Sequence, residues 1–454
     1  MGAALALNIA EKGFTVAVWN RTADRTDRFV ADAGALAQRI VPAPDLAAFV
    51  AALRPPRAII LMLPAGDAID AQMAALAPLL DADDLVIDAG NSNFRDTNRR
   101  AGVAPFGFLG IGVSGGEQGA RHGPSIMGGG ERRHWDRVAP VLSAIAARYE
   151  GAPCAAWLGE AGAGHFVKTV HNGIEYADMQ MIAEVYGVMR DGMGMTAPAI
   201  ATVFDRWNSG PLRSYLIEIS ATVAAVTDAV TGKPLLDVIV DAAGQKGTGR
   251  WTVIEAQHLG AAVPAVEAAV AARNLSARRA ERARGQQLFG AAPARLDDGA
   301  PDIATLEQAL IAGKIMCYAQ GFAMMAAAAR EFGWALPLAD IARVWRAGCI
   351  IRSAMLNDMA AALAEDSSRN LVFAPAFADR LRTAGAGLRS VVAASARAGL
   401  PVPALASGLA WFDTMRTARG TANLIQAQRD FFGLHGFERL DTGQGGQHGP
   451  WGYA

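Results

Sequence analysis

The sequence predicts an α/β domain followed by a large all-helical domain and a short C-terminal tail. In the first third of the 454-residue chain, short apolar segments alternate with helical or turn segments, which is typical of a doubly wound parallel sheet covered by helices. Beyond about residue 164, alanine-rich segments with a 3.6-residue spacing dominate as far as about residue 417. We therefore expect three parts, residues 1–161, 162–419 and 420–454.

The expected sheet is built from segments that are too short and too apolar for surface helices. The chain itself opens on a helical pattern that ends near Gly13, a residue type that is common just after a helix C-terminus. The expected strands are Phe14–Trp19, Ala58–Leu63, Leu85–Asp88, Phe108–Val113 and Ala155–Leu158.

Composition excludes several classes of protein. The 42 Lys and Arg residues balance 43 Asp and Glu residues, so neither a nucleic acid nor an anionic membrane is favoured as a partner. The three cysteines are far apart and form no metal-binding or disulfide pattern, which favours a reducing compartment. No uncharged apolar run reaches the roughly 18 residues of a membrane span. We expect a cytoplasmic protein that is neither membrane-embedded nor metal-dependent.

The first domain carries part of a dinucleotide site. Gly2 opens the first helix and resembles the last glycine of a G-x-G-x-x-G turn, whose backbone amides and helix dipole bind a pyrophosphate. Asn20, Arg21 and Thr22 follow the next strand, where NAD enzymes carry an acid for the ribose. Because Arg21 would attract a 2′-phosphate, NADP is preferred over NAD, although a plain polar turn is equally compatible. Asn91 also follows a strand and could touch cofactor or substrate.

The most informative segment is a polar stripe between residues 164 and 176. At about 100° per residue, its five polar members share an arc of roughly 140° on one helix face. A solvated surface face is the usual explanation, but this stripe combines proton donors and acceptors suited to acid–base chemistry. The five residues are Lys168, His171, Asn172, Glu175 and Tyr176.

Lysine is scarce in this chain, and Lys168 is therefore conspicuous. Lysine occurs only at positions 12, 168, 233, 246 and 314, and arginine supplies the other positive charges. Arginine cannot act as a proton-transferring base near neutral pH, whereas a lysine with a lowered pKa can. Lys168 is thus a candidate for proton transfer.

Two glycine-rich turns could hold anions, although each could also be a flexible surface turn. Ser114, Gly115 and Gly116 directly follow an expected strand, where a hydroxyl and bare amides would suit a carboxylate. Lys246 and Thr248 lie in a second turn that lacks the order of a nucleotide P-loop and suits a small phosphate ester better.

Taken together, these segments resemble the 6-phosphogluconate dehydrogenase family from Met1 to about Phe437. The matching stretches are Leu5–Ala10, Asn20–Thr22, Gly90–Ser92, Val113–Glu117, Ala163–Gln180, Trp207–Asn208, Ala243–Gly249, Trp251, Arg346–Arg352 and Asn423–His435. The resemblance implies a Rossmann-like domain and NADP-dependent oxidation of 6-phosphogluconate at carbon 3, with loss of carbon dioxide to give ribulose 5-phosphate in the pentose phosphate pathway.

The resemblance also implies a role for each candidate residue. Lys168 would act as base and then acid at the carbon 3 oxygen, and Glu175 would protonate carbon 1 of the enediol. Family members share active sites across an obligate homodimer, so Arg429 and His435 would reach the neighbouring subunit. Carboxylate and hydroxyls would be held by Ser114, Gly115, Gly116, His171 and Asn172, and the phosphate by Tyr176, Lys246, Thr248, Arg273, Arg429 and His435.

The chain departs from the family pattern near its start. The family begins with a strand and a G-L-x-x-M-G turn, of which only Met1 and Gly2 are present. Without that central strand, its neighbours would be separated by roughly 9.6 Å, which is too wide for hydrogen bonds. We expect that about a dozen residues, one strand and turn, belong upstream; an intact mass that matches Met1 as the natural start would contradict this. Pro64 also replaces a lysine that some members have near the cofactor.

Two other functions stay open from the sequence. One is a different β-hydroxyacid dehydrogenase, a group that typically lacks the Lys246 turn and the tail from Arg429 to His435. The other is a dimeric sugar-phosphate-binding protein that has lost cofactor binding.

Overall fold

The computed structural model describes residues 1–291, 295–297 and 301–451, which fall into two compact units, Met1–Gly408 and Leu409–Ala454. Six residues of the expected helical part and the last three of the tail lie outside the described residues.

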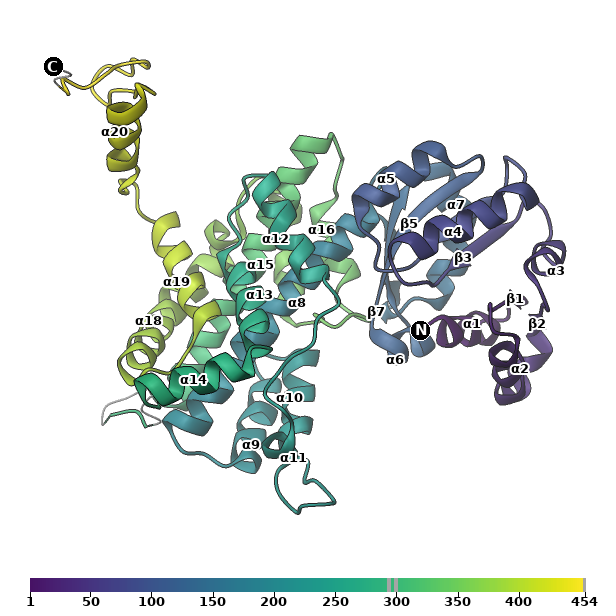
Figure 1. Cartoon of the computed structure of the whole chain (residues 1–454), viewed down its shortest axis with the longest axis horizontal. Coiled ribbons are helices and arrows are strands. Elements are labelled where there is room, and N and C mark those ends of the chain that lie inside the picture. The colour runs from purple at the N-terminus through teal and green to yellow at the C-terminus, as the bar shows by residue number, and fades with distance from the viewer. Residues whose placement is uncertain (292–294, 298–300, 452–454) are drawn as a thin grey trace. The chain divides into compact units, whose positions relative to one another are not determined.

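A five-stranded sheet forms the centre of the first domain (Figure 1). Its first three strands are parallel, the fourth is antiparallel to the third, and the last is parallel to the fourth. The predicted doubly wound sheet is therefore confirmed, but the fourth strand was not foreseen because its sequence SIMGGG has poor strand propensity. In spatial order the strands are β3 (Ala58–Leu61), β4 (Leu85–Asp88), β5 (Gly107–Ser114), β6 (Ser125–Gly130) and β9 (Ala155–Trp157).

The sheet is interrupted on the side of β3. β1 (Val16–Val18) pairs in parallel with β2 (Ile40–Pro42) as a separate sheet, and no strand of the described residues joins β1 to β3. This is the gap that the sequence predicts beside its first helix. A short antiparallel pair, β7 (Arg148–Tyr149) and β8 (Ala152–Pro153), lies elsewhere in the domain.

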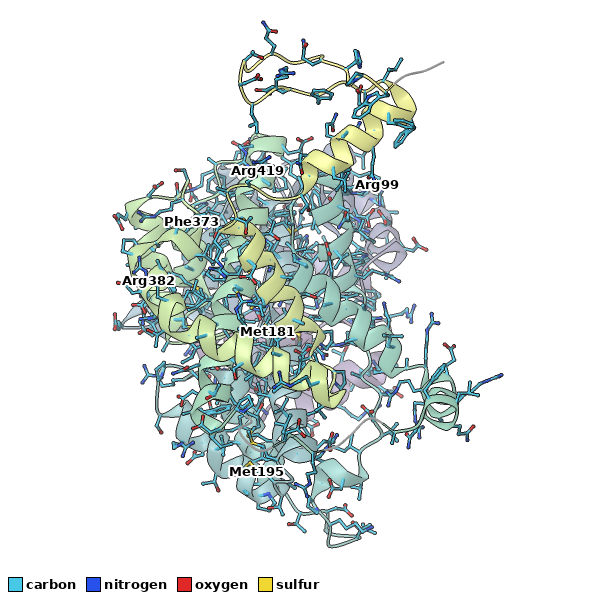
Figure 2. The ribbon with its side chains drawn as sticks, turned by 90° about the vertical axis from the view of Figure 1, so that its left-hand side faces the viewer. Arg99, Met181, Met195, Phe373, Arg382 and Arg419 are labelled. Atoms are coloured by element: carbon cyan, nitrogen blue, oxygen red, sulfur yellow. The ribbon has the colours of Figure 1, made fainter. Side chains whose placement is uncertain are left out.

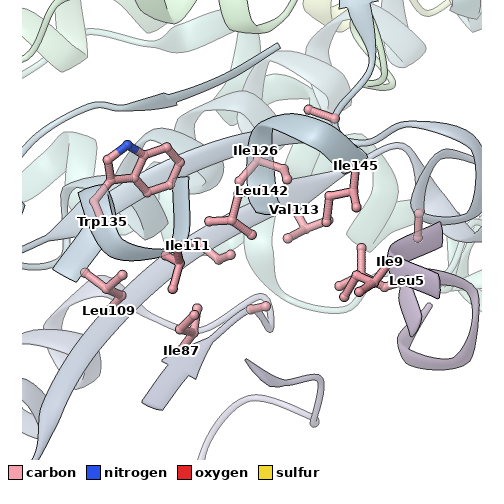
Figure 3. Packing of buried hydrophobic residues seen from close by; sticks show 14 of the residues in the cluster. Leu5, Ile9, Ile87, Leu109, Ile111, Val113, Ile126, Trp135, Leu142 and Ile145 are labelled. Carbon is pink, nitrogen blue, oxygen red and sulfur yellow. The ribbon is translucent and has the colours of Figure 1, made fainter. Parts of the chain in front are cut away.

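Helices bury both faces of this sheet. Leu5 and Ile9 of α1 (Gly2–Glu11) belong to the same apolar cluster as Ile87 and Val113 of the strands, and Trp135 of α7 (Arg132–Ile145) completes it (Figure 3). The other helical segments of this domain are α2 (Ala23–Asp32), η1 (Gly34–Arg39), α3 (Leu46–Ala51), α4 (Asp67–Leu76), η2 (Ala77–Leu79), α5 (Phe94–Val103) and α6 (Gly116–His122).

The second domain is helical, as predicted, and is organised around two long helices. α8 (Ala163–Gly187) packs on α15 (Ile303–Phe332) at small residues, since a Cβ added at Gly313 would lie 2.8 Å from the sulfur of Met181, a residue labelled in Figure 2. The remaining elements are η3 (Val188–Gly192), α9 (Ala197–Asn208), α10 (Tyr215–Ala225), α11 (Leu235–Val238), α12 (Thr248–His258), α13 (Pro264–Ser276), α14 (Arg279–Phe289), α16 (Leu338–Val344), α17 (Met355–Glu365), η4 (Leu371–Phe373), α18 (Pro375–Ala398), α19 (Pro403–Met415) and α20 (Ala422–Gly433), the last in the second unit.

Helix α15 is long and apolar enough to cross a membrane by length and composition alone. However, 83% of its most apolar window is buried inside the protein. Its apolar surface is therefore already covered by other helices, as in a core helix.

Candidate active site

The polar stripe of α8 is buried rather than solvated. Lys168 is 6% exposed, His171 is fully buried and Asn172 is 6% exposed. Glu175 and Tyr176 continue the same face by one turn, with Glu175 partly exposed. A helix face that buries so many hydrogen-bonding groups is costly unless those groups have partners.

The stripe and the end of β5 satisfy one another by hydrogen bonds. Lys168 Nζ donates to Asn172 Oδ1 at 2.9 Å and lies 3.4 Å from His171 Nδ1. The other ring nitrogen of His171 lies 3.2 Å from Ser114 Oγ at the carboxyl end of β5. Glu175 Oε2 lies 3.7 Å from His171 Nδ1. Five side chains from two elements thus form one continuous polar cluster.

Burial shifts the pKa values of this cluster in the directions that favour the neutral forms. Desolvation lowers the pKa of Lys168, although the Glu175 carboxylate acts in the opposite direction. Burial, aided by the charge of Lys168, lowers the pKa of His171 well below its ordinary value. Burial raises the pKa of Glu175, opposed by Lys168 and Arg273. A lysine able to accept a proton therefore lies beside a carboxyl able to donate one.

Glycines let α8 approach the sheet closely. A Cβ added at Gly112 of β5 would collide with Lys168 Cβ, and one at Gly164 would lie 2.6 Å from the carbonyl oxygen of Gly110. Gly129 of β6 likewise abuts the backbone of Gly164. These glycines are not among the residues predicted from the sequence, although glycines two apart in an otherwise apolar strand signal a close approach on one face.

The Ser114 turn has the backbone expected of an anion cradle. Gly115 (φ +113°) and Gly116 (φ +65°) adopt the left-handed region, and Gly115 immediately precedes α6. A Cβ at Gly115 would lie 2.5 Å from the carbonyl oxygen of Gly348. The turn thus depends on glycine both for its dihedral angles and for the approach of the segment around residue 348.

Helix α12 brings a second set of candidates to the other end of the stripe. Gly249 lies against the ring of Tyr176, and Thr252 Oγ1 donates to the carbonyl of Thr169 at 2.7 Å. The guanidinium carbon of Arg273 lies 3.7 Å from the centre of the Tyr176 ring. Thr248, the first residue of α12, is buried, whereas Lys246 lies in the exposed loop that precedes it.

The cofactor candidates lie on exposed turns. Asn20, Arg21 and Thr22 follow β1, and the Thr22 N–H donates to Asn20 Oδ1 at 2.9 Å. Gly2 begins α1 close to Met62, where its added Cβ would come within 3.2 Å of the Met62 Cβ.

The turn that carries Asn91 is held by hydrogen bonds to Asp88. This buried carboxylate accepts hydrogen bonds from the Gly90 N–H at 3.0 Å and Ser92 Oγ at 2.6 Å. Asn91, between those two residues, is exposed just beyond the end of β4.

Two phosphate candidates lie in the other unit. Arg429 belongs to α20, and His435 follows that helix by two residues; both are exposed. Both belong to the unit Leu409–Ala454, whereas the polar cluster of α8 and β5 belongs to Met1–Gly408.

Lysine scarcity alone would also have selected Lys314, which has a different role. Lys314 Nζ lies 2.6 Å from Asp178 Oδ2, and both side chains are buried between α15 and α8. This lysine is held as an ion pair, whereas Lys168 faces an amide oxygen and an imidazole. The neighbours of a lysine, rather than its rarity, distinguish a proton-transferring group from a structural one. Within the described residues, no group of three or more His, Cys, Asp or Glu side chains could hold a metal ion.

Comparisons with known proteins match both domains of the chain. Residues 1–159 match the family described as the NAD binding domain of 6-phosphogluconate dehydrogenase, and residues 164–451 match the C-terminal domain of 6-phosphogluconate dehydrogenase. The chain is 47% identical to "6-phosphogluconate dehydrogenase, decarboxylating" of Treponema pallidum over 98% of this chain and 93% of that protein. It is 48% identical to the protein of the same name from Schizosaccharomyces pombe over 97% of this chain and 90% of that one.

A solved structure agrees with the fold over nearly the whole chain. It is the Plasmodium falciparum 6-phosphogluconate dehydrogenase, described in its apo form and in complexes with NADP⁺ and with 6-phosphogluconate. The TM-score is 0.95 at 36% identity, with 99% of this chain and 98% of that chain covered.

Proposed function

This chain belongs to the 6-phosphogluconate dehydrogenase family, and from that premise we propose that it converts 6-phosphogluconate and NADP to ribulose 5-phosphate, carbon dioxide and NADPH. The observation that carries the proposal is the buried cluster in which Lys168 Nζ, 2.9 Å from Asn172 Oδ1, lies near a carboxyl with a raised pKa. The three-part division at residues 161 and 419 is part of the same proposal.

The residues near the start of the chain fit part of an NADP site. Arg21 is exposed, so its guanidinium is available to a 2′-phosphate. The N-terminus of α1 has no side-chain cap, which leaves its first amides and Gly2 available to a pyrophosphate. Asn20, Thr22 and Asn91 would complete the contacts. NADP, when bound, accepts a hydride from carbon 3 of the substrate.

Lys168 serves both halves of the reaction in this proposal. In its neutral form it takes the proton of the carbon 3 hydroxyl during oxidation. As carbon dioxide leaves, the bonding electrons move toward the carbon 3 oxygen, and Lys168 returns its proton there. The lowered pKa supports this cycle, because a lysine with an ordinary pKa would rarely be neutral before the first step.

Glu175 completes the reaction by protonating carbon 1 of the enediol, while Lys168, neutral again after returning its proton, takes the proton of the enediol oxygen so that the ketone forms. This step requires a neutral carboxyl, and the raised pKa of Glu175 supports it. Glu175 Oε2 lies 3.7 Å from His171 Nδ1, which in turn lies 3.4 Å from Lys168 Nζ. Glu175 and Lys168 can therefore contact the same substrate.

The remaining candidates bind the two ends of the substrate. Ser114, Gly115, Gly116, His171 and Asn172 hold the carboxylate and hydroxyls in this proposal, with the glycine turn supplying amides. The phosphate is held by Tyr176, Lys246, Thr248 and Arg273 from one subunit and by Arg429 and His435 from its partner.

We propose a homodimer in the cytoplasm, acting in the pentose phosphate pathway. Apolar side chains on α20 and the loop after it support the dimer, since Leu424, Ile425 and Phe432 are each more than half exposed in the described unit. A second copy of the chain would bury them and bring the tail to its active site.

The test is to mix the purified protein with 6-phosphogluconate and NADP and to follow NADPH absorbance together with carbon dioxide. Equal amounts of both products are expected. A folded dimer that reduces no NADP would overturn the proposal and favour a sugar-phosphate-binding protein. Reduction without carbon dioxide, or faster reduction with unphosphorylated hydroxyacids, would favour a different β-hydroxyacid dehydrogenase.

A further inference from the structure

The C-terminal unit contains a buried carboxylate that the proposed reaction does not use. Asp430 is fully buried, although its neighbours Arg429 and Phe431 in α20 are exposed. It therefore faces the segment that returns after the helix instead of facing solvent.

Several donors from the returning segment converge on this carboxylate. Asp430 Oδ1 accepts from the Gly436 N–H at 2.9 Å and lies 2.7 Å from His448 Nδ1. Asp430 Oδ2 accepts from the Gly449 N–H at 2.9 Å and from Trp451 Nε1 at 2.6 Å. One side chain thus joins α20, the turn after it and the last described residues.

A second side chain of α20 holds the same turn from its other side. Gln426 Nε2 donates to the carbonyl of Gly436, and Gln426 Oε1 accepts from Arg429 Nη1 at 3.1 Å. The Gly436 peptide is therefore held through its N–H by Asp430 and through its carbonyl by Gln426. His435 directly precedes this fixed peptide.

The turn needs this support because its backbone is unusual. Leu434 has φ +49° and Gly436 has φ +70°, so both flanks of His435 adopt the left-handed region. For a leucine this conformation is unfavourable and persists only where the surrounding contacts enforce it. Asp430 supplies one of those contacts by bonding to the residue that closes the turn.

We propose that Asp430 is a positioning residue for phosphate recognition, which fixes His435 relative to Arg429 so that both can contact one phosphate group. This inference rests on the proposed function, because it takes Arg429 and His435 as phosphate ligands. Asp430 itself is buried and touches neither substrate nor cofactor in the proposal. Asp430 acts indirectly, by holding the turn that Gly436 closes and that carries His435.

A carboxylate suits this position better than an amide. Burial acts to raise the pKa of Asp430, but the hydrogen bonds from Gly449, Trp451 and His448 outweigh burial and lower it, so the group stays ionised. An ionised carboxylate offers only acceptors to its surrounding donors. An asparagine would instead turn an amide NH₂ toward one of the pairs of N–H groups.

The test compares Asp430→Asn with Asp441→Asn in the full-length protein. Asp441 is an exposed carboxylate of the same tail and pairs with Arg439 at 2.6 Å, so its variant controls for loss of a tail charge. For Asp430→Asn we expect the KM for 6-phosphogluconate to rise about tenfold to a hundredfold, the range for one or two lost charge-assisted hydrogen bonds, with kcat changed less than about threefold. Asp441→Asn should leave both parameters within about twofold.

Two further variants separate positioning from a general loss of structure. Trp451→Phe removes one donor and keeps the ring, and it should raise KM in the same direction by a smaller factor. In a His435→Ala background, Asp430→Asn should add little, because the contact that it positions is already gone.

The outcomes distinguish this inference from the proposed function. A wild-type protein that fails to reduce NADP with 6-phosphogluconate overturns the proposed function, and this inference with it. An active wild type whose Asp430→Asn variant keeps its KM, loses only kcat, or adds its full effect on top of His435→Ala overturns the positioning role alone.

Discussion

The buried face of α8 and the exposed turn after β1 divide the proposed reaction between two kinds of structure. On α8, Lys168 and His171 are held within a hydrogen-bonded cluster before any ligand arrives. After β1, the Thr22 N–H donates to Asn20 Oδ1, the Thr22 carbonyl accepts from the Arg25 N–H, and Arg21 is exposed. Proton transfer is thus preorganised by buried side chains, whereas the exposed Arg21 side chain would meet its phosphate partner only when the ligand binds. Substitutions on α8 should therefore reduce activity far more than substitutions on the turn.

The largest effect is expected at Lys168. Lys168→Arg keeps the positive charge but removes a group that can be neutral near pH 7, so kcat should fall by about a thousandfold. Steady-state kinetics with saturating substrates measure this, and Lys12→Arg, on an exposed residue, is the matched control. Full turnover in Lys168→Arg would show that Lys168 is not the base and would contradict the contrast between α8 and the turn after β1.

A smaller loss is expected at Glu175. Glu175→Gln preserves the shape of the side chain but cannot donate a proton to carbon 1, so kcat should fall by about a hundredfold. In deuterated water, the variant should also lose exchange at carbon 1 of ribulose 5-phosphate. Glu331→Gln, at the exposed end of α15, should behave as wild type. Unchanged exchange in Glu175→Gln would assign the final proton to another group.

The same two residues predict the pH dependence. The rate should fall below an acidic limit, where Lys168 takes up a proton, and above a basic limit, where Glu175 loses one, by about tenfold per pH unit on each side. Burial lowers the pKa of Lys168 and raises the pKa of Glu175. The fraction of protein molecules in which both groups are neutral is therefore larger than the ordinary pKa values of about 10.4 and 4.3 would allow. A kcat/KM profile measures this, and a profile that is flat from pH 5 to pH 9 would contradict it.

A packing change should reach the same cluster without altering its chemistry. In Gly112→Ala the new methyl group collides with Lys168 Cβ, so we expect a loss of about 1–3 kcal/mol in the free energy of unfolding. A displaced base should also lower kcat by about tenfold. Thermal unfolding and kinetics measure both effects. Gly102→Ala, where a Cβ has no neighbour within 4 Å, should be neutral or stabilising. Equal behaviour of the two variants would show that α8 tolerates displacement.

The smallest effect is expected on the exposed turn. Arg21→Ala should raise the KM for NADP by about fivefold, because a solvent-screened charge contributes little, and should leave the KM for NAD unchanged. Arg28→Ala, on exposed α2, is the control. If Arg21→Ala raises the KM for NAD by the same factor, the residue does not recognise the 2′-phosphate. If it raises the KM for NADP by a hundredfold, the turn is as preorganised as α8.

The sequence predicts the members of the α8 face better than their surroundings. Helical periodicity brings Lys168, His171 and Glu175 to one side, because this depends only on the 3.6-residue repeat. Whether that side is buried depends on tertiary packing against β5, which no local pattern encodes. Lys314 illustrates the limit, since its partner Asp178 is distant in sequence and belongs to another helix.

The strands show the same division between local and distant causes. β3, β4 and β5 are recognisable from their apolar residues, and the gap beside β1 follows from the order of the elements. β2 contains a proline and β6 three glycines, so both depend on pairing with neighbouring strands rather than on their own propensity. The roles of Asn91, Arg273 and the other ligand candidates stay predictions.

The glycine contact between α8 and the sheet has a consequence for motion. Because Gly110, Gly112 and Gly164 bring backbone against backbone, the helix that bears Lys168 cannot slide over β5 without steric overlap. Thermal breathing that admits the substrate must therefore come from other segments, such as the exposed loop around Lys246. Amide hydrogen exchange should be slow along β5 and the first half of α8 and fast in that loop. The base and the central strand β5 then move as one rigid body throughout turnover.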